Sequence, residues 1–199
     1  MILISSADGG LTWDWEHTIA LGADVREPRY LSFNGVLHFV FFEGGIDPVA
    51  FEPHAIWRMK RMALGDWTAL EKVSDGTEVP WDMKVRNGKA YMTSYVGDHY
   101  AEGAVLDVLF KESSNGEDWT LVDGQPYVYR GGASEVAFEL EADGTLWAVT
   151  RNEDGDETGA GSHVCTASPE SLGTWDCSAQ SDPNRYDSPE LFRHGDTIY

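Results

Sequence analysis

Four acidic residues recur along this 199-residue chain, each near the start of a short apolar run: Glu27, Asp82, Glu135 and Glu190. Paired carboxyl groups are what hydrolysis of a glycosidic bond requires. One protonates the leaving oxygen, and the other activates water or attacks the sugar carbon. We therefore take Glu135, Asp82 and Glu190 as candidate catalytic residues. The alternative is a set of acids that water solvates or that together bind a cation.

The elements that must position these acids repeat at a nearly constant interval. Four turn glycines are separated by 53, 56 and 51 residues, and four tryptophans are separated by 54, 52 and 56. The glycines are Gly35, Gly88, Gly144 and Gly195, and the tryptophans are Trp13, Trp67, Trp119 and Trp175. Two independent markers that share one period indicate a repeat architecture.

One repeat contains four expected strands. Asn-Gly and Asp-Gly between alternating apolar residues predict two-residue hairpin turns, because both central positions need positive φ. The run 36–42 that leaves the first turn is continuously apolar, which is typical of a strand covered on both faces. A longer connection, an alternating segment such as 56–61 and a tryptophan-bearing turn follow. Tandem units of this kind predict an all-β fold, a β-propeller of four-stranded antiparallel blades.

The period divides the chain into blades. Three are complete, at approximately 23–76, 77–129 and 130–183, and two are half blades, at 1–22 and 184–199. We expect these four blades' worth of sequence to form a single but partial β-propeller domain, 1–199, within a ring of five or six blades. The alternative is that the terminal halves pair and close a four-bladed ring.

The charged openings of the first strands are expected to face the channel of the propeller, because the innermost strand of each blade lines it. By this position Arg26, Glu27, Arg29 and Trp81 are candidate substrate-binding residues. Trp81 would also desolvate its neighbour Asp82, which favours the protonated carboxyl that a general acid needs.

The turns that precede the tryptophans are expected to be structural. The segment Ser6-Ala7-Asp8-Gly9-Gly10-Leu11-Thr12-Trp13 fits the pattern Ser-x-Asp-x-Gly-x-Thr-Trp, and 113–119 is a shortened copy. Short side-chain oxygens cap the N–H groups of such a turn, glycine supplies the special φ, and tryptophan packs beneath. This pattern resembles the Asp boxes, or BNR repeats, of the sialidase-like β-propellers of the neuraminidase superfamily.

A second segment carries the same resemblance. Residues 135–151 are similar to the sialidase stretch in which a glutamate precedes an Asp-Gly turn and an arginine ends the next strand. The resemblance implies that Glu135 activates a tyrosine nucleophile. It also implies that Arg151, together with Arg26 of an Arg-x-Pro element, clamps a substrate carboxylate through its guanidinium fork. Tyr186 and Arg193 are the positions considered for the nucleophile and a third arginine, and neither is assigned.

These features predict a sialidase-like, glycan-processing protein. Its activity would be exo-acting glycoside hydrolysis with channel-lining carboxylates and an arginine clamp. A five-bladed-type glycosidase that uses Asp and Glu pairs is an alternative, and so is a non-catalytic propeller that binds glycans or proteins. Whether the chain is an enzyme therefore remains open at the level of sequence.

The charge of the chain limits its partners. It has 34 acidic and 14 basic residues, a formal net charge of −20. Phosphate binding needs a basic surface, so we expect no nucleic-acid partner, and the same charge disfavours anionic membranes. No run is long enough to span a bilayer. The expected ligand is a carbohydrate or another small molecule, and the sequence leaves the oligomeric state undetermined.

The two cysteines, Cys165 and Cys177, fall in the third and fourth expected strands of one blade. Antiparallel neighbours would bring them together, so they form either a disulfide or two buried free thiols. The disulfide would favour a secreted or extracellular protein, although the first residues do not resemble a signal peptide.

The glycine- and acid-rich stretch after Arg151 is expected to be an exposed loop at the channel mouth, with Asn152 as a further substrate-binding residue. Asn152, Asp154 and Asp156 alternate, and their oxygens could bind calcium. However, Glu157 stands where a calcium-binding loop of the EF-hand type needs glycine. No metal site and no cofactor are assigned, with calcium kept as the alternative.

Overall fold

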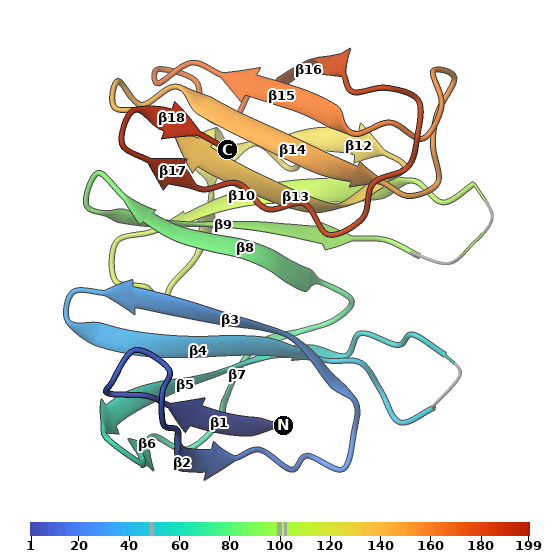
Figure 1. Cartoon of the computed structure of the whole chain (residues 1–199). Helices are drawn as coiled ribbons and strands as arrows, with labels where there is room; N and C mark the ends of the chain where they lie inside the picture. Colours follow the sequence, from blue (N-terminus) through green and yellow to red (C-terminus); the bar gives the residue numbers. More distant parts are fainter. Residues whose placement is uncertain (48–49, 99–100, 102) are drawn as a thin grey trace. The chain divides into compact units, whose positions relative to one another are not determined.

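A computed structural model of the chain describes residues 1–47, 50–98, 101 and 103–199 (Figure 1). The chain forms two compact units, Met1–Thr77 and Glu78–Tyr199. In the described residues every sheet is antiparallel, and the only helical element is a short 3₁₀ turn, η1, at Val122–Gly124. None of those residues belongs to a helix long and apolar enough to cross a membrane.

The first unit contains two sheets. A two-stranded sheet pairs β1 (Ile2–Ser5) with β2 (Asp14–Thr18). The larger sheet follows the order β3-β4-β5-β6, and β7 also pairs with β5. Its strands are β3 (Val25–Phe33), β4 (Val36–Glu43), β5 (Ala55–Ala63), β6 (Asp66–Trp67) and β7 (Glu71–Asp75).

The second unit contains three sheets. One follows the order β8-β9-β10-β11 with β12 also on β10, the next the order β13-β14-β15-β16, and the last is the pair β17-β18. The strands of the first are β8 (Val79–Arg86), β9 (Lys89–Val96), β10 (Leu106–Ser113), β11 (Thr120–Leu121) and β12 (Tyr129–Gly131). The others are β13 (Ala133–Leu140), β14 (Leu146–Asn152), β15 (His163–Ala167), β16 (Asp176–Gln180), β17 (Arg193–His194) and β18 (Thr197–Ile198).

The outer edge of two of these sheets differs from the single fourth strand expected. The third strand β5 pairs with β6 along one part and with β7 along another, and β10 does the same with β11 and β12. The fourth position is therefore divided into two short strands in each sheet. In the third large sheet β16 alone occupies this position.

The hairpin turns form as the Asn-Gly pairs predict. Asn34 and Gly35 have φ of 51° and 78°, and Asn87 and Gly88 have φ of 52° and 76°. Both pairs join a first strand to a second strand, β3 to β4 and β8 to β9. Because the turn fixes the register, it also fixes which side chains of the first strand face inward.

Each unit has its own apolar core. In the first unit the core contains Leu3, Ile19, Phe39, Phe41 and Met59. In the second unit a larger cluster joins strands of both large sheets. The ring of Phe110 of β10 packs edge-on against that of Phe138 of β13, with 5.2 Å between the ring centroids. All eight residues of β13 are buried. This strand is thus covered on both faces. Residues 38–42 of the apolar run 36–42, for which the sequence predicted such a strand, are buried as well.

A buried ion pair fastens the two sheets of the first unit to each other. Glu16 of β2 accepts hydrogen bonds from Arg61 Nε at 2.8 Å and from the indole of Trp67 at 3.0 Å. Burial alone would raise the pKa of Glu16, but hydrogen bonds from Arg61, Ser5 and the Gly65 amide lower the pKa from 4.5 to about 2. The carboxylate is therefore ionised at neutral pH although its side chain is only 3% exposed.

The turn at 6–13 is capped as expected, but its tryptophan is not buried. Ser6 Oγ accepts the Gly10 amide at 2.7 Å, and Asp8 accepts the Thr12 amide at 2.9 Å and its hydroxyl at 2.7 Å. The indole of Trp13 lies against the turn, since a Cβ placed on Gly10 would be 3.6 Å from its Cζ2 atom, but the residue is 59% exposed. Trp175, by contrast, lies 5.5 Å from Phe110 and packs against the core of its unit.

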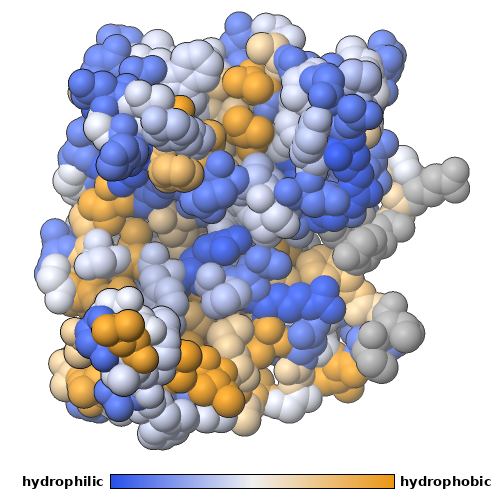
Figure 2. Space-filling model, in the orientation of Figure 1, coloured by the Kyte–Doolittle hydropathy of each residue, from blue (hydrophilic) through white to orange (hydrophobic). Residues whose placement is uncertain are grey.

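Apolar side chains are also exposed on the β1–β2 sheet itself. Ile2, Ile4 and Trp15 each have half or more of their surface in water. Figure 2 shows hydrophobic patches over the part of the first unit where Figure 1 draws these strands.

The expected disulfide is present in the second unit. It joins Cys165 of β15 to Cys177 of β16, with 4.0 Å between their Cα atoms. Cys165 is fully buried in the core of that unit. The bond closes a short loop, which contains the turn between these two strands.

Replacing Glu16 by Gln should destabilise the first unit in a pH-dependent way. The folded-state pKa lies below the unfolded value, so the stabilisation is complete above about pH 4.5 and is lost as the pH falls toward 2. A shift of this size corresponds to about 3 kcal/mol at neutral pH. Hydrogen exchange of peptides from 1–77 in urea should show this difference at pH 7 and a smaller one at pH 3. Asp14→Asn, an exposed control, should show neither, and a pH-independent gap would contradict the assignment.

Replacing both cysteines by alanine should lower the free energy of unfolding of the second unit by about 2–3 kcal/mol, because the unfolded chain regains the entropy of an open loop. Urea unfolding with and without dithiothreitol provides the measurement. The reductant should destabilise the wild type and leave the Cys165→Ala/Cys177→Ala variant unchanged. Equal midpoints for wild type and variant would show that the bond contributes nothing.

Candidate functional site

The candidate site lies where the first strand of each large sheet departs from regular hydrogen-bonded pairing with the second strand. The register of β8 on β9 shifts between Pro80 and Asp82, and that of β13 on β14 shifts between Ala133 and Val136. In the first unit β3 shifts in the same way between Arg26 and Arg29. Such bulges re-aim side chains and are frequent beside active sites. They fall on Trp81, on Ser134 and Glu135, and on Glu27 and Pro28.

Glu135 is held by two donors at the start of β13. Its Oε1 accepts a hydrogen bond from Arg151 Nη1 at 2.8 Å, and its Oε2 accepts the backbone N–H of Ser188 at 3.1 Å. The residue is 8% exposed. A guanidinium and an amide therefore both stabilise an ionised carboxylate here, which is the state required of a base or a nucleophile.

Arg151, at the end region of β14, lies among three carboxylates. Its Nη1 donates to Glu135, as described above. Its Nη2 donates to Glu153 at 2.9 Å, and its Nε donates to Asp187 at 2.6 Å. Burial would lower the pKa of Arg151, but the bond to Asp187 and the nearby charges of Glu135 and Glu153 raise it. Each of its three nitrogens is thus bound to a different carboxylate of the protein itself.

Asp82 joins the two large sheets of the second unit. One of its carboxylate oxygens binds the ammonium of Lys84 and accepts the backbone N–H of Phe138 at 3.0 Å. Its own amide donates to Thr93 Oγ1 at 3.2 Å, and that hydroxyl donates to the carbonyl of Val136. Both contacts therefore connect the carboxylate of Asp82 to groups of two strands, Lys84 of β8 and Phe138 of β13.

The segment 185–190 contacts most of the other candidate residues of this unit. Besides the Ser188 amide on Glu135, the carbonyl of Pro189 accepts the indole N–H of Trp81 at 3.4 Å. Glu190 lies 3.9 Å from the ammonium of Lys84, and its side chain is 69% exposed. The predicted catalytic residues Asp82, Glu135 and Glu190 are therefore brought together in one network of contacts.

The backbone of this segment is strained. Ser188 has φ of 54° although it is not glycine and although Pro189 follows it. The left-handed region is unfavourable for such a residue, and a following proline restricts it further. Glu27, which precedes Pro28 in the first unit, has φ of 50°. Strain of this kind tends to occur at functional sites, where the surrounding structure enforces it.

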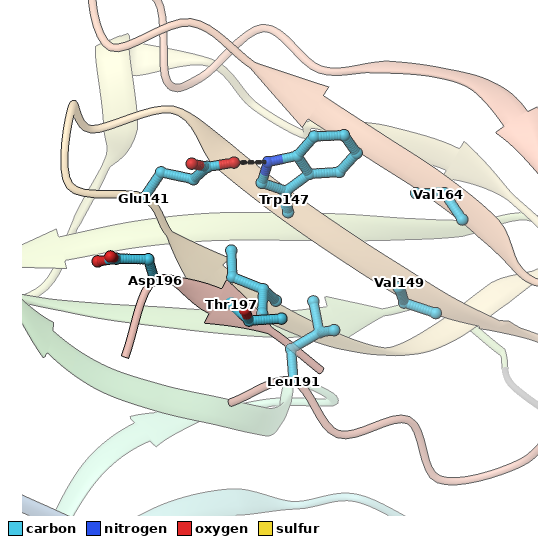
Figure 3. Close-up of a pocket in the computed structure, with 8 residues that line it drawn as sticks. Glu141, Trp147, Val149, Val164, Leu191, Asp196 and Thr197 are labelled. Carbon is cyan, nitrogen blue, oxygen red and sulfur yellow. Dashed lines mark hydrogen bonds between the residues drawn. The ribbon is translucent and has the colours of Figure 1, made fainter. Parts of the chain in front are cut away.

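A cavity of about 300 Å³ adjoins the segment. Tyr186, Asp187, Pro189 and Glu190 line it, together with Val149, Ser162, Val164 and Ser181. A second cavity, of about 400 Å³, shares Val149 and Val164 with it. Figure 3 shows that second cavity, where the indole N–H of Trp147 donates to Glu141 at 2.7 Å.

Tyr186 does not have the environment of a nucleophile. Its hydroxyl donates to Asp182 at 2.7 Å, and this bond, together with the charge of Asp182, raises the pKa of the phenol. A raised pKa works against the phenolate that an attack on a sugar carbon would need.

Asn152 is fully buried. Its amide donates to the carbonyl of Gly161 at 3.2 Å and to that of Gly159 at 3.3 Å, so it anchors the loop that follows it. Asp156 in this loop lies 2.7 Å from His163 Nε2. Within the described part of the chain no group of three or more His, Cys, Asp or Glu side chains is arranged to hold a metal ion.

The candidates of the first unit form a local cluster of their own. Arg26 pairs with Asp24 and lies over the ring of Phe51 at 5.5 Å, while Arg29 donates to Glu27 at 3.3 Å. Sequence reasoning missed Lys84, Glu153, Arg185 and Asp187, which complete the network of the second unit. Only the density of charge in 185–190 could have pointed to the last two.

Comparison with known proteins establishes the fold. No family model matches the chain, and no curated protein matches it. Solved structures do: an α-L-arabinanase of Penicillium chrysogenum complexed with arabinobiose (TM-score 0.61, 16% identity, 96% of this chain and 57% of that one) is similar. So are a protein of unknown function from Dyadobacter fermentans (0.70, 12%, 96% and 60%) and a GH43_1 enzyme of Xanthomonas citri complexed with xylose (0.57, 13%, 87% and 64%).

The chain spans less than two thirds of the length of each of these structures. At such identities the likeness concerns the fold, which is that of glycosidases built as β-propellers. The prediction of an all-β propeller is therefore confirmed. The two enzymes named here, an arabinanase and a GH43_1 enzyme, are not sialidases, so the resemblance is supported only at the level of a glycoside-hydrolase-like propeller.

Removing the Asp82 carboxylate should destabilise the second unit. Asp82→Ala leaves the Lys84 ammonium and the Phe138 amide buried without this acceptor, which should cost about 3 kcal/mol. Asp82→Asn keeps an acceptor and should cost less. Glu190→Ala removes only a longer, exposed contact to the same lysine and should cost less than about 1 kcal/mol. Urea unfolding of the three variants provides the comparison, and an equal loss for Asp82→Ala and Glu190→Ala would refute the buried link.

Proposed function

We propose that this chain belongs to a glycoside hydrolase in which carboxylates on the first strands cleave a glycosidic bond without an arginine clamp. The observation that carries the proposal is the network that gathers Glu135, Asp82 and Glu190 around the segment 185–190. The likeness to an arabinanase and to a GH43_1 enzyme supports a carbohydrate as the ligand class. The disulfide supports an oxidising compartment, such as the cell exterior.

The three carboxyl groups differ in their surroundings, and these differences suggest separate roles. Glu135, bound by Arg151 and the Ser188 amide, acts as the ionised base or nucleophile. Asp82, bound by Lys84 and the Phe138 amide, positions Lys84 and the strand β13. A proton donor must hold a proton and then release it near the leaving oxygen. Glu190 has the fewest partners and lines the cavity of about 300 Å³, so it is the proposed acid.

The arginine clamp of a sialidase is the less favoured mechanism. A clamp needs two N–H groups free to bind one substrate carboxylate in a bidentate manner. Three of the five N–H groups of Arg151, one on each nitrogen, already donate to carboxylates of the protein, so a substrate carboxylate would share this guanidinium with three acids. Tyr186 is also occupied by Asp182. The alternative that uses Asp and Glu pairs requires neither residue to be free.

The roles of Glu135 and Glu190 can be separated with two glycosides of an L-arabinofuranose or D-xylose unit, one aryl and one alkyl. An acid is needed only for a poor leaving group, whereas the base or nucleophile is needed for all. Glu135→Gln should lower kcat at least about 10³-fold on both 4-nitrophenyl and methyl glycosides. Glu190→Gln should retain most turnover of the 4-nitrophenyl glycoside and lose that of the methyl glycoside.

Glu170→Gln, an exposed residue outside the site, is the matched control and should leave both rates unchanged. If the wild type turns over neither glycoside but Glu135→Gln binds them as tightly as the wild type, the hydrolytic proposal fails and a glycan-binding propeller takes its place.

A further inference from the structure

Two arginines and two acids form a closed ring of ion pairs beside the cavity. Asp187 Oδ1 accepts from Arg151 Nε at 2.6 Å and from Arg185 Nε at 2.9 Å. Glu153 Oε1 accepts from the same two residues, at 2.9 Å from Arg151 and 3.1 Å from Arg185. The two acids differ in exposure: the Glu153 side chain is 12% exposed and that of Asp187 53%. Asp187 is therefore the member that a ligand would meet.

We propose that Asp187 determines which sugars the site accepts, by occupying the guanidinium N–H groups that would otherwise bind a sugar carboxylate. With Asp187 in place the site takes uncharged sugars and excludes uronic and sialic acids. This inference rests on the proposed function, because it assigns the substrate class of the same site.

The chemistry of the ring explains the exclusion. A sugar carboxylate would have to take the place of Asp187 and accept the two Nε–H groups that Asp187 now holds, one from Arg151 and one from Arg185. It would also approach a site in which Glu135, Glu153 and Asp187 outnumber the two arginines. Like charge repels the acidic sugar, whereas neutral hydroxyl groups can bind to the remaining lone pairs of the carboxylates.

The position of Asp187 is fixed by its neighbours in the chain. The next residue, Ser188, adopts positive φ and donates its amide to Glu135 at 3.1 Å. The carbonyl of Pro189 accepts the indole N–H of Trp81. The backbone at Asp187 therefore cannot shift without breaking the hydrogen bonds to Glu135 and Trp81. Hydrogen bonds from Arg185 and Arg151 also lower the pKa of Asp187, so its charge is present at neutral pH.

Removing this one charge should open the site to acidic sugars. Asp187→Ala and the isosteric Asp187→Asn are compared with the wild type, with circular dichroism to establish that each variant is folded. Calorimetry measures the binding of three probes: arabinobiose, D-glucuronic acid and N-acetylneuraminic acid. Glu170→Ala is the matched control, because it removes one negative charge from an exposed position where no hydrogen bond or ion pair is found.

We expect the wild type to bind arabinobiose and to bind both acidic sugars at least tenfold more weakly. Both Asp187 variants should bind the acidic sugars at least tenfold more tightly than the wild type, with a steep salt dependence, and neither should bind arabinobiose more tightly than the wild type does. Glu170→Ala should shift none of the three. An equal gain in Glu170→Ala would assign the effect to net charge and overturn the role of Asp187.

Three further outcomes would also overturn it: acidic sugars bound by the wild type as tightly as arabinobiose, no gain in either folded Asp187 variant, or no binding of any probe. Failure of the hydrolytic proposal is distinguishable, because it is judged by turnover of aryl glycosides. A wild type that turns over none of them, with the expected shift in binding, would leave Asp187 as the selector of a binding site.

Discussion

Several carboxylates in both units become buried when the sheets pack, and a cation or a backbone amide must then replace the hydrogen bonds that each made to water. Arg61 donates to Glu16, and Arg86 Nε of β8 donates to Glu139 Oε1 of β13 at 2.6 Å. Lys84 and the backbone amide of Phe138 donate to Asp82. Because each of these acids binds at least one group on another strand, satisfying its charge also fixes the strands relative to one another.

The same requirement shapes the candidate site. A regular strand would direct alternate side chains into the core and leave no room for a charged group beside its cation. The bulges in β8 and β13 break this alternation where Trp81 and Glu135 lie. The strained turn at Ser188 then brings an amide to the second oxygen of Glu135. The chemistry therefore depends on irregular backbone that regular sheets hold in place.

Much of the fold was predictable from sequence because it is encoded locally and repeatedly. The two-residue turns need a backbone conformation that few pairs other than Asn-Gly adopt, so Asn34-Gly35 and Asn87-Gly88 each predict a hairpin. The recurrence of Glu135, Asp82 and Glu190 at similar places in the repeat was enough to nominate them. The disulfide followed from two cysteines on adjacent strands, where only one pairing exists.

The rest depends on contacts between distant residues, which leave no local signal. Arg185 and Asp187 stand in a polar stretch without periodicity, and their partners lie 32 to 36 residues earlier. The exposure of Trp13 depends on how little sheet surrounds its turn, which the turn sequence does not encode. The division of the outer strand into β6 and β7 likewise depends on where β5 can still offer pairing partners.

The complete burial of β13 has a consequence for how the second unit comes apart. Neither face of this strand is exposed, and its backbone binds Thr93 and Asp82, which lie 43 and 56 residues earlier. Neither large sheet of the unit can therefore open alone without exposing apolar surface and leaving these polar groups without partners. The two sheets behave as one cooperative block, in which the amides of β13 exchange with solvent only through global unfolding.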